Sequence, residues 1–258
     1  AQESPLWMRH CALSPDGTTI AFTYKGDIYT VPSTGGRATQ ITTNPAFDTE
    51  PVWSPDSKQI AFASDRMGSL DVFVVSSEGG APQRLTTHSG SEKPVAYKDN
   101  KHILFTANIA PSAEDAGFPS GQFQQVYEVA VTGGRPAMFS SMPMECISIN
   151  KEGVMLYQDK KGYEDYWRKH QVSPIARDIW TYTPGKKPVY QKQTTFGGED
   201  REPVWSPDGK SFYYLSEEKG SFNIFQRTPG TTTSQQITFH TKHPVRFLSI
   251  STTGTLCY

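Results

Sequence analysis

The sequence has no long apolar run and almost no net charge, and each absence excludes a class of protein. No stretch of about 18 consecutive apolar residues exists, so no segment is typical of a membrane-spanning helix. The 25 basic and 26 acidic residues give a net charge of −1, without the basic surface typical of nucleic-acid binding. We therefore expect no nucleic-acid partner and no membrane insertion.

Cysteine is also scarce. Cys11, Cys146 and Cys257 are odd in number and show no C-x-x-C spacing, which is typical of small buried side chains. One disulfide with one free thiol is the alternative that the sequence leaves open. The first residues, Ala1-Gln2-Glu3, resemble what remains after a signal peptidase cuts behind a small residue. We therefore expect export to the periplasm or cell envelope, with a cytoplasmic location as the alternative.

The common catalytic and metal-binding motifs are missing as well. The chain contains no G-x-S-x-G, no H-E-x-x-H and no phosphate-binding glycine loop after a strand. His240 and His243 have an H-x-x-H spacing, but no carboxylate lies near them in the sequence, so we interpret this segment as a loop. We predict no catalytic residue, no metal site and no cofactor in this chain.

What the sequence does contain is a repeat. The heptapeptide EPVWSPD occurs at Glu50–Asp56 and again at Glu202–Asp208, and S-P-D also begins at Ser14. Degenerate copies of this turn begin at Tyr97, Asn150 and Ser251, and a short apolar run follows every copy. A polar residue with an aliphatic–aromatic pair follows in five units: Asp27-Ile28-Tyr29, Asp71-Val72-Phe73, Gln125-Val126-Tyr127, Asp178-Ile179-Trp180 and Asn223-Ile224-Phe225.

Each unit is interpreted as four short strands separated by turns. Proline presets φ for a turn, and serine and aspartate bond the local backbone, so S-P-D-G reverses the chain. Four short antiparallel strands in a period of about 40–45 residues are typical of a β-propeller blade. Trp53 and Trp205 then fall at the ends of innermost strands, where we expect them to lie in the core between blades.

The predicted fold is therefore all-β, a single β-propeller domain over residues 1–258. It has five complete four-stranded blades, at about 8–42, 50–86, 93–139, 145–194 and 202–238, and a truncated sixth at about 245–258. Because an unpaired strand edge is a liability that natural domains avoid, we expect this chain to be part of a longer polypeptide with a six-bladed propeller.

Two blades carry long insertions between their second and third strands, at residues 106–124 and 158–177. In a four-stranded meander these loops emerge on the same face as the connections between blades, so both are expected beside one mouth of the central channel. They act as a lid or docking element, or they are neutral variation at tolerant loop tips. The candidate channel-mouth residues, for which ordinary solvated surface is the alternative, are Arg9, Asp48, Glu50, Asp65, Arg66, Lys93, Glu145, Tyr166, Trp167 and Arg201.

The repeat resembles the WD40-like β-propeller repeats shared by the periplasmic TolB protein and the tricorn-type peptidases. The pattern S-P-D-G-x-x-I-A-F…D-I-Y-x-V…G-G-x-x-x-x-L-T is clearest in 14–22, 54–64 with 71–75, and 206–223. The first blade begins within ten residues of the N-terminus, which is more similar to the tricorn-type arrangement.

The resemblance implies a non-catalytic N-terminal propeller of a larger serine peptidase, which restricts the passage of peptides to or from a buried active site. It also implies that peptides or a protein partner bind at one propeller face, beside the remaining domains of the parent chain. None of the family's catalytic residues falls in this sequence. The alternatives are a TolB-like protein-binding propeller with no enzyme attached and the propeller of a prolyl-oligopeptidase-like peptidase.

Overall fold

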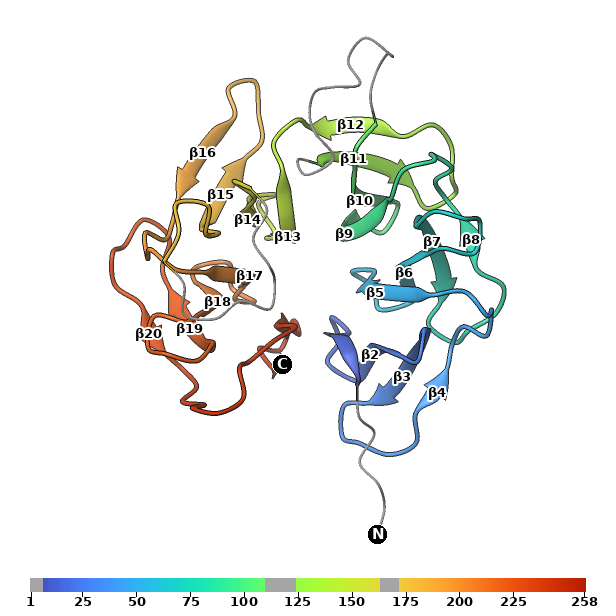
Figure 1. Ribbon diagram of the computed structural model, residues 1–258, viewed down its shortest axis with the longest axis horizontal. Helices are drawn as coiled ribbons and strands as arrows, with labels where there is room; N and C mark the ends of the chain where they lie inside the picture. The colour runs from blue at the N-terminus through green and yellow to red at the C-terminus, as the bar shows by residue number, and fades with distance from the viewer. Residues whose placement is uncertain (1–6, 110–123, 163–171) are drawn as a thin grey trace.

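The computed structural model describes residues 7–109, 124–162 and 172–258, and it shows blades arranged in a ring about a common axis (Figure 1). Every regular element in these ranges is a β-strand. Five sheets are four-stranded antiparallel meanders, and a sixth has two strands. The predicted β-propeller, with five complete blades and a truncated sixth, is therefore confirmed. No helix in the described ranges has the length and apolar character needed to cross a membrane.

The strands follow the chain from the axis outward in each blade. Blade 1 contains β1 (Arg9–Leu13), β2 (Thr19–Tyr24), β3 (Asp27–Pro32) and β4 (Thr39–Gln40). Blade 2 contains β5 (Asp48–Trp53), β6 (Gln59–Ser64), β7 (Asp71–Ser76) and β8 (Gln83–Arg84). Blade 3 contains β9 (Lys93–Asp99), β10 (His102–Ala107), β11 (Gln125–Ala130) and β12 (Ala137–Ser140).

The remaining blades follow the same order. Blade 4 contains β13 (Met144–Ile149), β14 (Met155–Asp159), β15 (Ile179–Thr183) and β16 (Val189–Lys192). Blade 5 contains β17 (Asp200–Trp205), β18 (Phe212–Ser216), β19 (Asn223–Arg227) and β20 (Gln235–Gln236). Blade 6 contains β21 (Ser249–Ile250) and β22 (Leu256–Cys257).

The S-P-D turns satisfy their own polar groups. Ser14 Oγ donates to Asp16 Oδ1 at 2.6 Å, and the Thr19 amide donates to Ser14 Oγ at 3.0 Å. The bond from Ser14, together with one from the Thr18 amide at 2.9 Å, holds the pKa of Asp16 below its ordinary value. The same serine–aspartate bond recurs at 2.7 Å between Ser54 and Asp56. Within each turn, local bonds reverse the chain between the first and second strands of a blade, and the next blade adds a bond, as from the Asp16 amide to Ser57 Oγ at 3.2 Å.

A second repeated bond joins the third and fourth strands. The hydroxyl of the threonine that closes a unit accepts a hydrogen bond from the backbone amide that follows the polar residue of the third strand. Thr86 Oγ1 accepts from the Val72 amide at 2.9 Å, and Thr238 Oγ1 accepts from the Ile224 amide at 2.9 Å. Because this bond fixes the outer strand, the repeated L-T and I-T motifs have a structural role.

The core lies between blades. Trp53 is 8% exposed and packs with Ala21 and Ile28 of blade 1, and its Nε1 donates to the Ala12 carbonyl at 2.8 Å. Trp205 Nε1 makes the equivalent bond to the Val154 carbonyl of blade 4, at 3.1 Å. The predicted position of both tryptophans in the core between blades is confirmed.

Blade 6 closes the ring by packing against blade 1 (Figure 1). The Leu13 amide donates to Ser249 Oγ at 3.0 Å, and the Thr252 amide donates to the Pro15 carbonyl at 2.7 Å. The first of these bonds repeats a bond between blades 4 and 5, where the Trp205 amide donates to Ser148 Oγ at 3.1 Å. The contact between the last and first blades therefore has the geometry of an internal blade contact.

Candidate functional site

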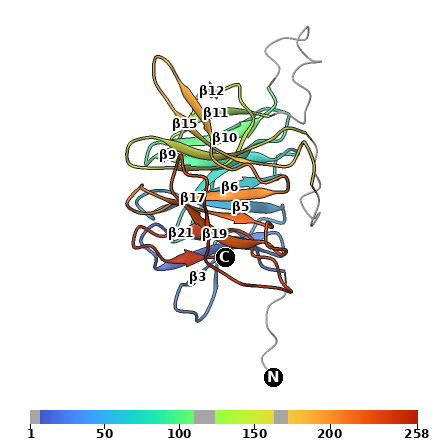
Figure 2. The ribbon, with the colours of Figure 1, turned by 90° about the vertical axis from the view of Figure 1, so that its left-hand side faces the viewer.

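The two faces of the ring, which Figure 2 shows edge-on, are built differently. On one face, the segment that begins blade 2, 3, 5 or 6 bonds to the loop between the second and third strands of the preceding blade. The Asp48 amide donates to the Gly26 carbonyl at 2.7 Å, and the Asp200 amide donates to the Arg177 carbonyl at 3.1 Å. We call this the loop face, and we call the opposite face, which carries the S-P-D turns, the turn face.

Both long insertions leave their blades on the loop face. Strand β10 ends at Ala107 and strand β14 ends at Asp159, and each runs toward this face. The inserted residues 110–123 and 163–171 lie outside the described residues, and so do the candidates Tyr166 and Trp167. Their role as a lid or docking element therefore stays a prediction.

Most innermost strands contain a bulge close to the loop face. Non-glycine residues with positive φ mark these bulges, and the register of the strand pairs shifts at the same places. Such backbone costs free energy for a residue with a Cβ atom, so a repeated bulge indicates a constraint shared by the blades. The bulge residues are His10, Glu50, Cys146 and Glu202, with φ between 50° and 55°, and Phe247, just before β21, has a similar φ of 59°.

The bulges bring side chains of neighbouring blades together. Lys93 Nζ lies 2.6 Å from Glu50 Oε1, which joins blade 3 to blade 2, and both side chains are partly exposed. The rings of His10 and Phe247 lie 4.9 Å apart across the contact between blades 1 and 6. Burial lowers the pKa of His10, and the positive charge of Lys93 adds to the shift while Glu50 opposes it. Uncharged histidine is therefore the favoured form beside this ion pair at neutral pH.

A second charged cluster joins blades 4 and 5. Arg177 Nε lies 3.0 Å from Glu145 Oε2, and Glu199 Oε2 lies 2.9 Å from Arg201 Nε. Arg177 also reaches Glu199, at 3.4 Å. Burial opposes the ionisation of Glu145, but the charges of Arg177 and Lys160 hold its pKa below its ordinary value. Glu145 and Arg177 are therefore held in their charged forms, and each charged group of the cluster lies against one of opposite sign.

Other candidate residues form ion pairs or hydrogen bonds that hold parts of a blade together. Asp48 is fully buried and binds Arg66 NH2 through both carboxylate oxygens at 2.9 Å. The Arg66 guanidinium also lies 4.5 Å from the ring centre of Phe73. Asp65 Oδ1 accepts a hydrogen bond from the Phe47 amide at 2.7 Å.

Arg9 lies 5.5 Å from the ring centre of Trp7, next to the first bulge. Arg201 is only 2% exposed. At the start of the innermost strands, Glu50, Lys93 and Glu145 are accessible, with side chains between 27% and 35% exposed, and Arg9 is also partly exposed. A role of the candidate residues in binding at the channel mouth stays a prediction.

Glu92 and Asp200 begin blades 3 and 5 where Asp48 begins blade 2. Both are buried, with 1% of the surface exposed, and burial raises the pKa of each to about 7. At the equivalent position of blade 2, Arg66 NH2 lies within hydrogen-bonding distance of both oxygens of Asp48. Glu92 lies beside the buried Asp71, whose charge raises the pKa of Glu92 further. These carboxyl groups therefore take up protons close to neutral pH.

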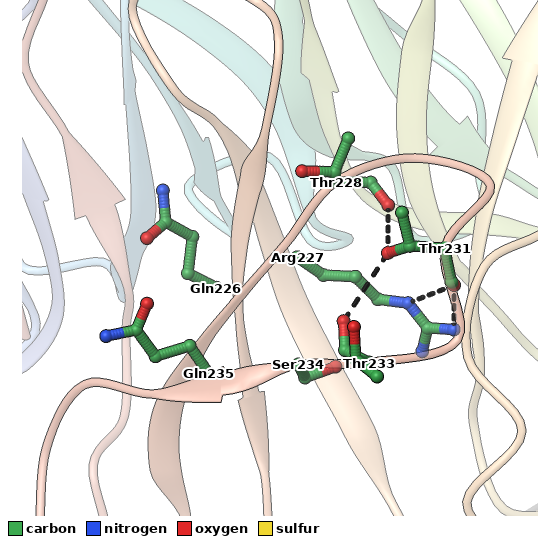
Figure 3. Close-up of a pocket in the computed structure, with 7 residues that line it drawn as sticks. All are labelled: Gln226, Arg227, Thr228, Thr231, Thr233, Ser234 and Gln235. Carbon is green, nitrogen blue, oxygen red and sulfur yellow. Dashed lines mark hydrogen bonds between the residues drawn. The ribbon is translucent and has the colours of Figure 1, made fainter.

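Two surface pockets lie at the outer rim and not at the axis. One, of about 360 Å³, lies beside β19 and β20, where Arg227 Nε donates to the Thr231 carbonyl at 2.8 Å (Figure 3). The other, of about 370 Å³, lies between the connection that leaves blade 1 and the outer turn of blade 2. Its lining includes Pro45 and Pro82. Within the described ranges, no group of three histidine, cysteine or carboxylate side chains is placed to bind a metal.

Exposed apolar side chains occur on the loop face in several blades. They come from the segment before β1, the connections between blades and the loops between second and third strands. The other exposed large apolar residues in the described ranges lie in outer strands or beside the chain end. On the loop face they are Trp7, Met8, Phe47, Met67, Met142, Val172 and Phe239, each at least 42% exposed.

The bulges and the ring of apolar residues were not identified from the sequence. The bulges coincide with the third residue before each strand-ending tryptophan, as Glu50 and Glu202 do in the repeated EPVWSPD. Superposing the degenerate units on this position reveals Cys146 as the same site in blade 4. The apolar side chains carry no such signal because each stands alone in a loop of different length.

Comparison with known proteins gives one family for nearly the whole chain. Residues 5–258 match the family model described as the tricorn protease N-terminal beta propeller domain. Tricorn protease homolog 1 of Streptomyces coelicolor is 39% identical over 213 residues, which cover 82% of this chain. The chain spans only 19% of the length of that relative.

Solved structures agree with the fold. The crystal structure of the tricorn protease superposes with a TM-score of 0.78 and 17% identity, over 95% of this chain and 24% of that one. A putative TolB from Agrobacterium tumefaciens superposes with a TM-score of 0.70 and 14% identity, over 90% of this chain and 81% of that one. At these identities the likeness concerns the fold alone.

Proposed function

Because this chain belongs to the family of tricorn protease N-terminal β-propeller domains, we propose that it is the non-catalytic propeller of a larger serine peptidase. In this role it restricts the passage of peptides to or from an active site that other domains of the same polypeptide provide. The chemistry of peptide hydrolysis is then supplied outside this chain, and the propeller contributes selection at its loop face.

The observation that carries this proposal is the arrangement of opposite charges beside the bulges. Glu50 and Lys93 join blades 2 and 3, while Glu145 and Arg177 belong to the cluster between blades 4 and 5. A short peptide carries a positive and a negative terminus, and it meets partners of both signs at the start of the innermost strands. The Glu50–Lys93 pair is partly exposed and costs little to open, so a passing peptide can exchange with it, whereas Arg177 is buried and only the Glu145 side of its pair is accessible.

Docking of a protein partner on the loop face is the second candidate function. The exposed apolar side chains favour it, since Phe47, Met67 and Phe239 are 51%, 60% and 74% exposed on connections and loops of three different blades. Scattered apolar residues are ordinary on a protein surface, whereas their recurrence on one face of a ring supports contact with another protein or domain.

The test uses the whole polypeptide that carries this chain. The double variant Glu50→Gln with Lys93→Met removes the charges of the axial pair, and Lys98→Met with Glu128→Gln removes a 2.8 Å ion pair elsewhere in blade 3. We expect only the axial variant to change the ratio of kcat/KM between long and short peptides. The proposal is wrong if both variants leave this ratio unchanged or shift it equally. An unchanged ratio together with the loss of a co-purifying protein would support docking instead.

A further inference from the structure

Cys257 faces blade 1 across the contact that closes the ring. Ser249 in β21 pairs directly with Cys257 in β22. Directly opposite residues of an antiparallel pair project from the same face of the sheet. The Ser249 hydroxyl bonds to the Leu13 amide of blade 1, so this face, with Cys257 on it, is turned toward β1. Strand β22 is also in contact with β1.

Cys11 faces blade 6 from the other side of the same contact. Its neighbour Ala12 packs against the core shared with blade 2. Successive residues of a strand project to opposite faces, so Leu13 projects away from blade 2 and toward blade 6, and Cys11, two residues earlier, lies within electrostatic reach of Cys257. The bulge between Arg9 and Ala12 brings this part of β1 out of regular register, close to the axis where neighbouring blades converge.

We propose that Cys11 and Cys257 form a disulfide bond that joins the first and last blades and closes the ring covalently. Both cysteines are free and partly buried in the structure. The bond requires the two Cα atoms to lie roughly 4.4–6.8 Å apart, a separation available to facing residues where two blades meet near the axis. Cys146 remains the free thiol because it lies in blade 4, across the ring from blade 1 (Figure 1).

The reaction is a thiol–disulfide exchange with an oxidised dithiol protein or glutathione disulfide. The thiolate of one cysteine attacks the oxidant and forms a mixed disulfide, releasing one thiol. The second cysteine then attacks the bound sulfur, which forms the bond between Cys11 and Cys257 and releases the second thiol. Two protein thiols are oxidised and one external disulfide is reduced to two thiols.

The raised pKa values of both thiols predict that the bond forms and exchanges slowly. Burial raises the pKa of Cys11 to about 11, and the charge that the nearby Cys257 carries when ionised adds to this shift. Burial also raises the pKa of Cys257. Little thiolate is therefore present at neutral pH, so uncatalysed exchange is slow and accelerates as the pH rises.

Peptide mapping of the whole polypeptide tests the proposal. The protein is incubated with glutathione disulfide at alkaline pH, its remaining thiols are blocked with iodoacetamide, and it is digested with trypsin without reductant. We expect peptide 10–25 to be recovered linked to the peptide that begins at Phe247. We expect Cys146 to be recovered alkylated. Recovery of Cys11 and Cys257 as separate alkylated or glutathionylated residues would overturn the proposal.

Matched variants give a second readout. Oxidation should raise the Tm of the wild-type protein by roughly 5 °C, and dithiothreitol should reverse the shift. Cys146→Ser should keep the shift, while Cys11→Ser and Cys257→Ser should both lose it. If the shift persists in Cys257→Ser, a different thiol is responsible and the proposal fails. The peptide map of the wild-type protein decides the matter even if one variant folds poorly.

Discussion

The hydroxyl of Ser249 in the last blade accepts a hydrogen bond from the backbone amide of Leu13 in the first blade, at 3.0 Å. Ser148 makes the same bond to the Trp205 amide between blades 4 and 5, at 3.1 Å. Replacing each serine therefore allows the contact that closes the ring to be compared with a contact between two internal blades. An amide left without its acceptor in a partly buried contact costs about 1–2 kcal/mol.

We predict that Ser249→Ala and Ser148→Ala lower the free energy of unfolding by similar amounts, about 1 kcal/mol each. Urea denaturation followed by tryptophan fluorescence measures both. If blades 1 and 6 separate in solution, Ser148→Ala alone will be destabilising.

The pH dependence of stability provides a second prediction, for Glu92. Its pKa of about 7 in the folded protein is above the ordinary value of 4.5, mainly because of burial. The folded state therefore holds a proton that the unfolded state has lost between these values, so the stabilising contribution is complete below about pH 4.5 and is lost as the pH rises to about 7. Asp200 contributes in the same direction, with a pKa also raised to about 7.

We predict that Glu92→Gln, which mimics the protonated side chain, stabilises the protein at pH 8 by about 1–3 kcal/mol and has little effect at pH 4.5. Thermal melts of both proteins at the two pH values measure this difference. Asp48→Asn is the matched control because Asp48 begins the preceding blade, and it should destabilise the protein at both pH values by weakening the pair with Arg66. A Glu92→Gln effect that is equal at pH 4.5 and 8 would show that Glu92 ionises normally.

The threonine that closes each unit gives a third prediction. Thr86 is fully buried, and its Oγ1 accepts the Val72 amide at 2.9 Å. Thr86→Val keeps the shape but leaves the amide without a partner, so we expect a loss of about 1–3 kcal/mol. Thr39→Val in the exposed strand β4 should change stability by less than about 0.5 kcal/mol. Equal effects of the two substitutions in chemical denaturation would contradict a structural role for the motif.

The fold was predictable because the turns and the threonine hydrogen bonds that define a blade join residues close together in the sequence. Ser14 and Asp16 satisfy each other within one turn, and Thr86 reaches a strand only 14 residues earlier, so the motif recurs wherever a blade does. The core position of Trp53 also followed from its place in the repeat, since each blade covers the next in the same way.

The site was less predictable because its contacts join different blades. Lys93 meets Glu50 from 43 residues away, and Cys11 approaches Cys257 only after the ring has closed. Asp48 and Arg66 lie on the same face as Glu50, but whether each is exposed or buried depends on side chains of other strands such as Phe73. The spacing of residues in the sequence does not show which side chains become those neighbours.

Alanine substitutions at two glycines separate the effect of backbone strain on stability from the effect of the contact between the first and last blades. Gly17 and Gly35 both have positive φ, at 77° and 87°, so a Cβ atom strains either backbone by about 1 kcal/mol. A Cβ atom on Gly17 would lie 3.2 Å from the Ser251 Cβ of blade 6, whereas nothing lies within 4 Å of one on Gly35. We predict that Gly17→Ala lowers the Tm further than Gly35→Ala, because blade 6 must shift to accommodate the methyl group. Equal losses of Tm in differential scanning calorimetry would mean that blade 6 does not cover the first turn in solution, and the closed ring would then be wrong.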